Sequence, residues 1–488
     1  MCLFALQAIP TPAGAQVDFV SSGAFAAAVS PESVVVSDFD NDGHVDLAGA
    51  GGSAEVVILL GDGTGSLSPT LSYPVAPLPR SIAAADFNED GNVDLAVASA
   101  GTFSGDGTVA VLLGDGTGGL GPPQDVETNV NPAFVVAADF NEDGHPDLAT
   151  AKSEVSSGQG TVSVSLGDGL GGFSPPQELE LDLPSELLVT ADFNEDSHLD
   201  LAVAHPGFAP GGTGVISILF GDGAGSFTMP QDAVQNMAPV YFATADFNED
   251  GHLDLAVRET NFLPDWPCTA ISILVGDGAG GFSPAVALAV GCTGYPFAVA
   301  DFDMDGDIDL AVPERIGVPP FFGNRSLFLL PGDGTAAFGE PLELCVDGTP
   351  ETPVVADLNE NGYADLVVLG FNSGVPGNVM SVFINQGALI LPHFVRGDVN
   401  ADGAFNIADP IEILGVLFAG AGAAGCQDAA DANDDGRLDI ADPISMLNSL
   451  FLFDPWPGQW SPPACPDIHC GADPTGDALD CASSPQCP

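Results

Sequence analysis

Residues 38–49 read DFDNDGHVDLAG, and close copies of this phrase return six times along the 488-residue chain. The later copies begin at residues 86, 139, 192, 246, 301 and 357, and read DFNEDGNVDLAV, DFNEDGHPDLAT, DFNEDSHLDLAV, DFNEDGHLDLAV, DFDMDGDIDLAV and DLNENGYADLVV. Successive copies start 48 to 56 residues apart, which suits four strands with their loops better than a pair of helices. The repeat therefore predicts seven similar β units.

A second phrase follows the first in six of the seven units, as in VVILLGDGTGSL from residue 56 and ISILVGDGAGGF from residue 271. The seventh version, MSVFINQGALIL from residue 380, lacks the GDG. Asp-Gly pairs accept the positive φ angles of tight hairpins, so GDG aspartates such as Asp115 and Asp277 are interpreted as turn formers rather than ligands. Each unit then reads as four short strands joined by the acidic loop, a variable loop and this turn.

Seven four-stranded sheets can protect their strand edges by packing radially against one another. The predicted fold class is therefore mainly β: a seven-bladed β-propeller over residues 17–394, followed by a small α-helical, EF-hand-like domain. The seventh unit has no clear fourth strand, whereas residues 17–29, before the first unit, resemble one. We expect this N-terminal segment to complete the last blade and close the ring.

Oxygen-bearing side chains occupy positions 1, 3, 5 and 9 of each acidic loop, and Gly usually occupies position 6. Several carboxylates within nine residues repel one another unless a cation lies among them. Ca²⁺ takes about six to eight such hard oxygens, and the carbonyl of position 7 would add one, whereas Mg²⁺ prefers a stricter octahedron with retained water. The predicted Ca²⁺ ligands, loop by loop, are Asp38, Asp40, Asp42, Asp46; Asp86, Asn88, Asp90, Asp94; Asp139, Asn141, Asp143, Asp147; Asp192, Asn194, Asp196, Asp200; Asp246, Asn248, Asp250, Asp254; Asp301, Asp303, Asp305, Asp309; and Asp357, Asn359, Asn361, Asp365.

Two loops deviate from the pattern. Ser197 replaces the glycine in the fourth, and the seventh has only two carboxylates, so we expect the seventh site to be weakest or empty. Position 7 is histidine in four loops, which indicates a shared structural position rather than four catalytic residues; these are His44, His145, His198 and His252. The alternative, that the loops are merely solvated turns, leaves the constant Asp-Leu at positions 9 and 10 without a cause.

Two further acidic loops follow the repeats, DVNADGAFNIAD from residue 398 and DANDDGRLDIAD from residue 431. Oxygen donors at positions 1, 3, 5, 9 and 12, with Gly at position 6, match a Ca²⁺ loop. Each loop leads into an apolar helical pattern with Pro in its first turn, where a missing N–H costs little. The predicted ligands are Asp398, Asn400, Asp402, Asn406, Asp409, Asp431, Asn433, Asp435, Asp439 and Asp442.

The pairing of DxDxDGxxDL with GDGxGxF resembles the FG-GAP/VCBS repeat, the blade unit of integrin α-subunit propellers and of many secreted bacterial proteins. The resemblance covers residues 17–394 and implies Ca²⁺ between the first and second strands of blades, with ligands bound on the opposite face. It would place on or beside that face Phe208, Trp266, Tyr295, Phe321, Phe322 and Arg325, which ordinary loop packing would explain equally well. Cys268 and Cys292 would share the face, so their pairing is plausible.

The paired C-terminal loops, with no entering helix, resemble dockerin type I repeats over residues 396–452. The resemblance implies a cohesin-like partner, with Ile407 and Ala408, and Ile440 and Ala441, at the recognition positions. A purely structural clamp is the alternative. The tripeptide at residues 396–398 reads RGD, but its aspartate is needed as a metal ligand.

Only 7 Lys and Arg residues accompany 68 Asp and Glu, for a formal net charge of −61. This balance excludes nucleic acid and anionic membrane surfaces as partners, and no apolar stretch reaches the roughly 18 residues of a membrane span. Residues 1–16 resemble a truncated signal peptide. The even set of eight later cysteines, four of them in a Cys-rich tail at 456–488, favours disulfides over zinc and a secreted or extracellular location.

These features predict a secreted or cell-surface calcium-binding adhesion or ligand-binding protein, monomeric, whose propeller binds an extracellular protein or glycan. Residues 395–455 would form its dockerin-like attachment module. The alternative is an extracellular polysaccharide lyase or hydrolase on a propeller scaffold. No common catalytic motif supports an enzyme, no catalytic residue is predicted, and the basic residues for a lyase pocket are scarce: Lys152, Arg258, Arg315 and Arg325. A passive matrix component is a third alternative.

Overall fold

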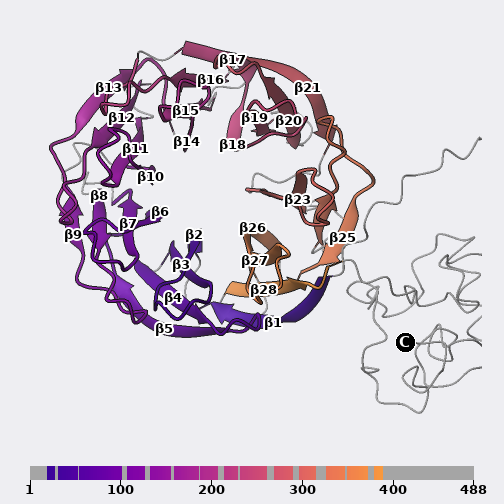
Figure 1. Ribbon diagram of the computed structural model, residues 1–488, viewed down its shortest axis with the longest axis horizontal. Coiled ribbons are helices and arrows are strands. Elements are labelled where there is room, and N and C mark those ends of the chain that lie inside the picture. The colour runs from indigo at the N-terminus through magenta and orange to yellow at the C-terminus, as the bar shows by residue number, and fades with distance from the viewer. Residues whose placement is uncertain are drawn as a thin grey trace, which may run out of the picture. The chain divides into compact units, whose positions relative to one another are not determined.

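Each of the first six repeat units folds as one four-stranded antiparallel sheet, and the seventh unit supplies three strands of another. The seven sheets stand side by side in a ring (Figure 1). The predicted seven-bladed β-propeller is confirmed. The computed structural model describes residues 19–27, 31–52, 54–101, 107–126, 132–154, 159–185, 187–206, 214–228, 231–260, 269–289, 296–314, 326–346, 349–371 and 378–387. The chain divides into two compact units, residues 1–388 and 389–488, and the described residues belong to the first.

Within each blade the strands follow the chain from the centre of the ring outward, except in the seventh (Figure 1). Blades one to three are β2 (Pro31–Ser37), β3 (Asp46–Gly51), β4 (Glu55–Gly61), β5 (Leu67–Pro74); β6 (Pro79–Ala85), β7 (Asp94–Ser99), β8 (Thr108–Leu112), β9 (Gln124–Val126); and β10 (Phe134–Ala138), β11 (Asp147–Glu154), β12 (Gln159–Ser165), β13 (Gln177–Leu181). Blades four to six are β14 (Leu187–Ala191), β15 (Asp200–His205), β16 (Gly214–Leu219), β17 (Gln231–Met237); β18 (Pro239–Ala245), β19 (Asp254–Thr260), β20 (Thr269–Gly276), β21 (Phe282–Ala289); and β22 (Ala298–Ala300), β23 (Asp309–Glu314), β24 (Ser326–Leu330), β25 (Leu342–Cys345). Blade seven is β26 (Thr349–Ala356), β27 (Asp365–Phe371), β28 (Asn378–Asn385) and β1 (Phe19–Ala27).

The second strand of each blade is apolar on both faces because it lies between two neighbouring blades. In blade two, Leu95 packs into the cluster shared with blade one, whereas Ala96 packs into the cluster shared with blade three. One such hydrophobic cluster fills each of the seven junctions. The DLAV phrase therefore reads as a continuous apolar run, as expected for a strand buried on both sides.

The two repeated phrases occur together because their aromatic residues meet across the junctions. Phe140 of the third acidic loop contacts Phe227, which follows the GDG turn of blade four, edge to face at 5.5 Å between ring centroids. The same contact joins Phe87 to Phe173 at 5.5 Å and Phe193 to Phe282 at 6.0 Å. At these three junctions one blade thus supplies half of a contact that the next blade completes.

The N-terminal strand closes the ring, as predicted from residues 17–29. β1 pairs antiparallel with β28, with Phe19 opposite Asn385 and Ala27 opposite Asn378. Phe19 also contacts Phe302 of blade six at 6.1 Å, and it thereby fills the place that the phenylalanine after a GDG turn holds elsewhere. The loss of the GDG phrase in the seventh repeat is consistent with this arrangement. The outer strand of blade seven is β1, so the third strand needs no tight turn into a fourth strand.

Several predictions fall outside the described residues. They concern the leader at 1–16, the dockerin-like module at 395–455 with all of its ligands, the tail at 456–488 and the proposed disulfide partners. The same holds for the six aromatic and arginine residues assigned to the ligand face. In the described part of the chain, no helix is long and apolar enough to cross a bilayer.

Candidate metal centre: the seven acidic loops

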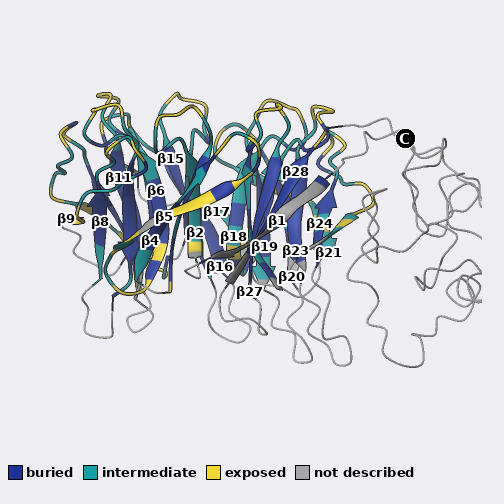
Figure 2. Cartoon of the chain, turned by 90° about the horizontal axis from the view of Figure 1, so that it is seen from below, coloured by how far each residue is buried: buried dark blue, intermediate teal, exposed yellow. Residues whose placement is uncertain are grey.

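The acidic loops join the first and second strands of the blades, and the GDG turns join the third and fourth. Both kinds of connection lie along one rim of the ring, where many of the described residues are exposed (Figure 2). The GDG aspartates hold their own turns, as predicted. Asp115, for example, accepts hydrogen bonds from the Thr117 hydroxyl at 2.7 Å and from the amides of Thr117 at 2.9 Å and Gly119 at 3.0 Å. These bonds, first of all that from the hydroxyl, lower the pKa of Asp115.

Backbone amides curl each acidic loop around its own side chains. In the third loop, the carboxylate of Asp139 accepts hydrogen bonds from the amides of Asp143 at 3.2 Å and Gly144 at 2.8 Å. Asn141 Oδ1 accepts a second bond from the Asp143 amide at 3.0 Å, and Asp143 Oδ1 accepts one from the His145 amide at 2.9 Å. The side chains of positions 1, 3 and 5 are therefore gathered on the inside of one turn, where their remaining lone pairs could hold a cation.

The aspartate at position 9 has a structural role that the sequence argument missed. Its side chain is buried to within 2% exposure in all seven loops. One carboxylate oxygen accepts the amide of position 2 at 2.8–3.0 Å. The other accepts, at 2.7–2.8 Å, the amide that begins the turn between the third and fourth strands in blades one to six, and the amide of Asn385 at the end of β28 in blade seven. This pair of hydrogen bonds, called the brace below, already requires an aspartate at position 9. The repetition of that aspartate is therefore not by itself a sign of metal binding.

We expect Asp200→Asn to lower the free energy of unfolding of the metal-free protein by about 2–4 kcal/mol. An asparagine offers one acceptor oxygen, so one of the amides of Phe193 and Gly221 would face an NH₂ group and remain buried without a partner, which costs about 1–3 kcal/mol before steric adjustment. Asp196→Asn in the same loop is the matched control, because its side chain lies at the exposed rim. Urea unfolding measures both, and equal losses would contradict the brace.

Burial also raises the pKa of the position-9 aspartates that form these braces. Desolvation raises the pKa of Asp94, Asp200 and Asp365 to about 6 and that of Asp309 to about 7, against the pull of their two amide bonds. The folded state therefore binds protons more tightly than the unfolded chain, whose aspartates titrate near 3.8. Stability conferred by these protons is complete below the unfolded pKa and is lost as the pH rises through about 6 to 7.

Without divalent cations, the protein is accordingly expected to be more stable at pH 5.5 than at pH 7.5. Urea unfolding in EDTA at the two pH values tests this expectation. Asp309→Asn should flatten the pH dependence of the free energy of unfolding between pH 6 and 8 more than Asp200→Asn does, because Asp309 has the higher pKa of the two. A stability that rises with pH over this range would be the opposite result.

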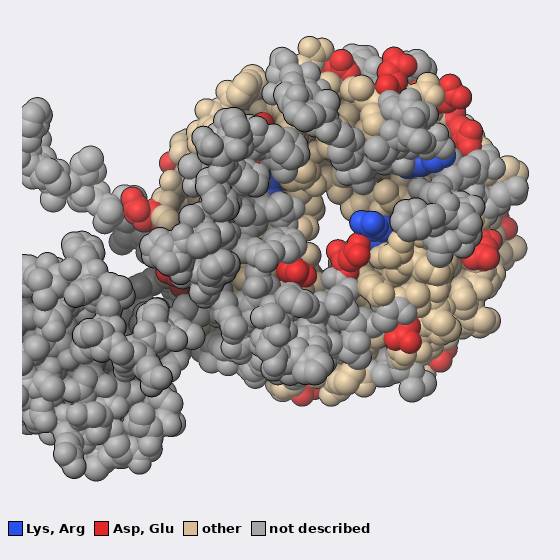
Figure 3. Space-filling model, turned by 180° about the vertical axis from the view of Figure 1, so that it is seen from behind, with Lys and Arg blue, Asp and Glu red and all other residues tan. Residues whose placement is uncertain are grey.

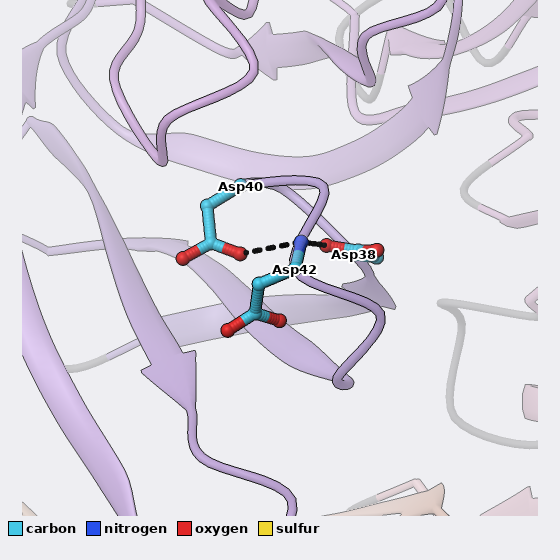
Figure 4. Close-up of side chains that lie close together, drawn as sticks. All are labelled: Asp38, Asp40 and Asp42. Atoms are coloured by element: carbon cyan, nitrogen blue, oxygen red, sulfur yellow. Dashed lines mark hydrogen bonds between the residues drawn. The ribbon is translucent and has the colours of Figure 1, made fainter.

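Carboxylates converge most closely in the first and sixth loops. Among the described residues, two acidic triads have ligand atoms within 4.8 Å of one another: Asp38, Asp40 and Asp42, and Asp301, Asp303 and Asp309. Figure 4 shows the first triad, with Asp38 and Asp40 approaching the amide of Asp42 from either side. In the sixth loop Asp303 is only 8% exposed, and Asp301 Oδ1 is buried without a hydrogen-bond partner.

The other loops are arranged differently at position 3. In loops two to five, the asparagine there donates from Nδ2 to the position-5 carboxylate at 2.9–3.1 Å, as Asn248 does to Asp250 at 3.0 Å. In the seventh loop, Asn361 Nδ2 donates instead to the carbonyl of Asn385 at 2.7 Å. The side-chain NH₂ group of position 5 in that loop is thus engaged by its own blade. Weak or absent metal binding by the seventh loop stays a prediction.

The four histidines at position 7 occupy one structural position and contact a residue that the sequence argument overlooked. Each ring nitrogen Nδ1 meets the glutamate at position 4 of the preceding loop, as His145 meets Glu89 and His198 meets Glu142. The glutamate hydrogen bond is the main cause that raises the pKa of each histidine. A signal existed in the sequence, because Glu at position 4 comes one repeat before three of the four histidines, and His44 of the first repeat meets Glu360 of the last.

Comparison with known proteins agrees with this architecture. Residues 38–97, 86–150 and 192–257 match the family model described as the FG-GAP-like repeat. The chain carries FG-GAP-like repeats. The FG-GAP-like matches span the acidic loops and the strands on either side of them, and a propeller built of such repeats fits a ligand-binding or adhesion protein.

Similarity to individual proteins is confined to structure. Among curated protein sequences, none matches the chain significantly. Among solved structures, two similar chains come from crystals of BBS1N in complex with ARL6DN, one soaked with mercury and one with lead. Each is 11% identical, and each alignment covers 75% of this chain and 96% of the other, with TM-scores of 0.49 and 0.47.

Proposed function

We propose that the protein is a calcium-binding propeller, secreted or held at the cell surface, that binds an extracellular protein or glycan. The main support for metal binding comes from the sixth loop, where a buried oxygen of Asp301 lacks a hydrogen-bond partner beside Asp303 and Asp309. Burying carboxylates at this proximity is costly unless a cation compensates them. The donors are all oxygen, which suits Ca²⁺ rather than a transition metal.

The side chains at positions 1, 3, 5 and 9 would hold the ion, and its charge would neutralise their mutual repulsion. The position-9 brace is compatible with this role because each carboxylate oxygen that accepts one amide keeps a second lone pair. The ion would then join the loop to the amide network that already links the first, second and third strands of a blade. Calcium would act here as a structural clamp of the rim.

The ligand is proposed to bind the face opposite the loops, and the dockerin-like module to attach the protein to a cohesin-like partner. Figure 3 views that opposite face, where a few Lys and Arg side chains lie near the central opening beside acidic residues. Arg80 pairs there with Glu32 at 3.6 Å. Arg258 is fully buried, and desolvation lowers its pKa to about 10. Neither offers a free cation for a lyase pocket.

Two measurements test this function. Metal analysis by mass spectrometry, after the protein is loaded with Ca²⁺ and passed through a desalting column, should show several ions per chain, and Asp303→Ala should remove at least one. The Ca²⁺-loaded protein is then screened against glycans and extracellular proteins, with polysaccharide turnover assayed in parallel. Saturable binding without product supports a binding protein. Product release would favour the enzyme alternative, and absence of bound Ca²⁺ would refute the metal site.

A further inference from the structure

Six of the seven junctions between blades carry a backbone hydrogen bond from the GDG turn of one blade to the acidic loop of the preceding blade. The amide that follows the GDG glycines donates to the carbonyl of position 2 in the preceding blade at 2.8–3.1 Å. The pairs are Gly65 to Leu358, Gly118 to Phe39, Gly171 to Phe87, Gly225 to Phe140, Gly280 to Phe193 and Ala336 to Phe247. At the remaining junction, Asn385 Nδ2 donates to the carbonyl of Phe302 at 2.7 Å. These bonds hold adjacent loops at a constant spacing around the ring.

Side chains of adjacent loops also meet directly, from position 4 of one loop to position 7 of the next. Hydrogen bonds of this kind join Asn41 to Asn92, Glu89 to His145, Glu142 to His198, Glu195 to His252 and Glu360 to His44. The corresponding residues at the other two junctions are Glu249 with Asp307, and Met304 with Tyr363. Five of the seven junctions thus have a hydrogen-bonded bridge of this kind, and at a sixth junction Glu249 also interacts with Asp307.

Both ends of each bridge lie between expected metal ligands. Position 4 separates ligand positions 3 and 5, and it holds a left-handed φ of 56–58° in all seven loops, which non-glycine residues adopt only when the surroundings enforce it. Position 7 donates its amide to the position-5 carboxylate, at 2.9 Å from His198 to Asp196. A change in the ligand geometry of one loop must therefore move an end of the bridge.

One side of the histidine ring at the end of the bridge lies against the GDG turn of its own blade. A Cβ built on Gly223 would lie 2.4 Å from His198 Nδ1 and 2.9 Å from Glu142 Oε1, so the ring and the glutamate are packed against the GDG turn. The same crowding occurs at Gly169 with His145 and at Gly278 with His252. The bridge thus lies with one side against the GDG turn, while 35% of the His198 side chain and 53% of the Glu142 side chain remain exposed to solvent.

We propose that neighbouring acidic loops bind Ca²⁺ with positive cooperativity, transmitted through the bridges from position 4 to position 7. The inference rests on the proposed function, since it requires the loops to bind the ion. A loop that has closed on Ca²⁺ fixes its own position 4, which holds position 7 of the next loop in place. The next ion then binds to a loop that has already lost part of its freedom.

Hydrogen–deuterium exchange followed by mass spectrometry tests this on the full chain, because it yields a Ca²⁺ midpoint for each loop separately. The variant Asp139→Asn with Asp143→Asn disables loop three while it keeps acceptor oxygens for the loop amides. We expect the midpoints of loops two and four to rise about fivefold, the lower end of common coupling strengths, and that of loop six to stay unchanged.

Glu142→Ala supplies the decisive control, because it cuts the bridge from loop three to loop four and touches no expected ligand. In this background the loop-three substitutions should no longer shift the midpoint of loop four, while loop two, linked through Glu89, still responds. Exchange protection of β11 and β15 reports whether each variant is folded. Loops that titrate independently would overturn the cooperativity alone, whereas loops that show no Ca²⁺-dependent protection would overturn the proposed function as well.

Discussion

Addition of Ca²⁺ to metal-free protein is expected to raise its unfolding temperature by about 20 °C. At a Ca²⁺ concentration 100 times the dissociation constant, each site stabilises the folded chain by about 2.7 kcal/mol, or about 16 kcal/mol for the six loops with three or more carboxylates. The unfolding entropy of a domain of this size is about 0.8 kcal/mol per degree, which converts that sum into the stated shift. Differential scanning calorimetry with EDTA and with 1 mM Ca²⁺ measures it.

The expected rise in unfolding temperature is large because six loops contribute to it. Removal of single sites should therefore reduce the rise in steps. Asp40→Ala and Asp303→Ala remove a carboxylate from the two triads, and each is expected to lower the Ca²⁺-dependent shift by about 3 °C. Thr64→Ala, in a GDG turn, is the matched rim substitution and should leave the shift unchanged. An unfolding temperature that does not respond to Ca²⁺ would leave the acidic loops as solvated turns braced by position 9.

Removal of residues 1–27 is expected to lower the unfolding temperature by about 5–10 °C, the second largest effect. β28 would lose its partner strand, and Phe302 would lose its contact with Phe19. A buried phenylalanine alone is worth about 3–5 kcal/mol, and the exposed edge of β28 adds the cost of unpaired backbone groups. Removal of residues 1–18 only keeps the strand and should cost little, which circular dichroism melts of both variants would show.

A rearranged chain would distinguish the effect of losing strand β1 from the effect of shortening the chain. In a variant that lacks residues 1–27 at the start, residues 19–27 can be inserted after Gly387 through a copy of a GDG turn. Because Phe19 already lies opposite Asn385, the inserted strand would form the hairpin that the other six blades contain. Its melting temperature should return to that of the unaltered protein. A failure to recover, with the variant folded, would show that closure by the N-terminal strand matters less than we infer.

Much of this architecture could be predicted from the chain because a repeated unit presents the same pattern many times. The spacing of the DF phrases identified seven blades, and the missing fourth strand of the last unit pointed to residues 17–29. Period and turn chemistry are local properties, set by a few neighbouring residues such as the Asp-Gly pair at 115–116. Local patterns of this kind are visible without any knowledge of what lies across a junction.

The candidate site was only partly predictable, and position 9 shows why. From the sequence, Asp147 and Asp200 had one evident use, as ligands. Both prove to accept two backbone amides each, one of them from a turn 20 or 21 residues away. The glutamates at position 4 were overlooked for the same reason, because their partners lie a whole repeat further along the chain.

The order of residues in the chain alone determined the number of blades, the strands within each blade and the strand that closes the ring, since these depend on local spacing and on hydrophobic period. Only the tertiary structure decided how one loop meets the next: which phenylalanines touch, which histidine receives which glutamate, and which carboxylates converge. Those contacts depend on the twist and separation of adjacent sheets, which are set by packing in the junction clusters and leave no local mark on the sequence.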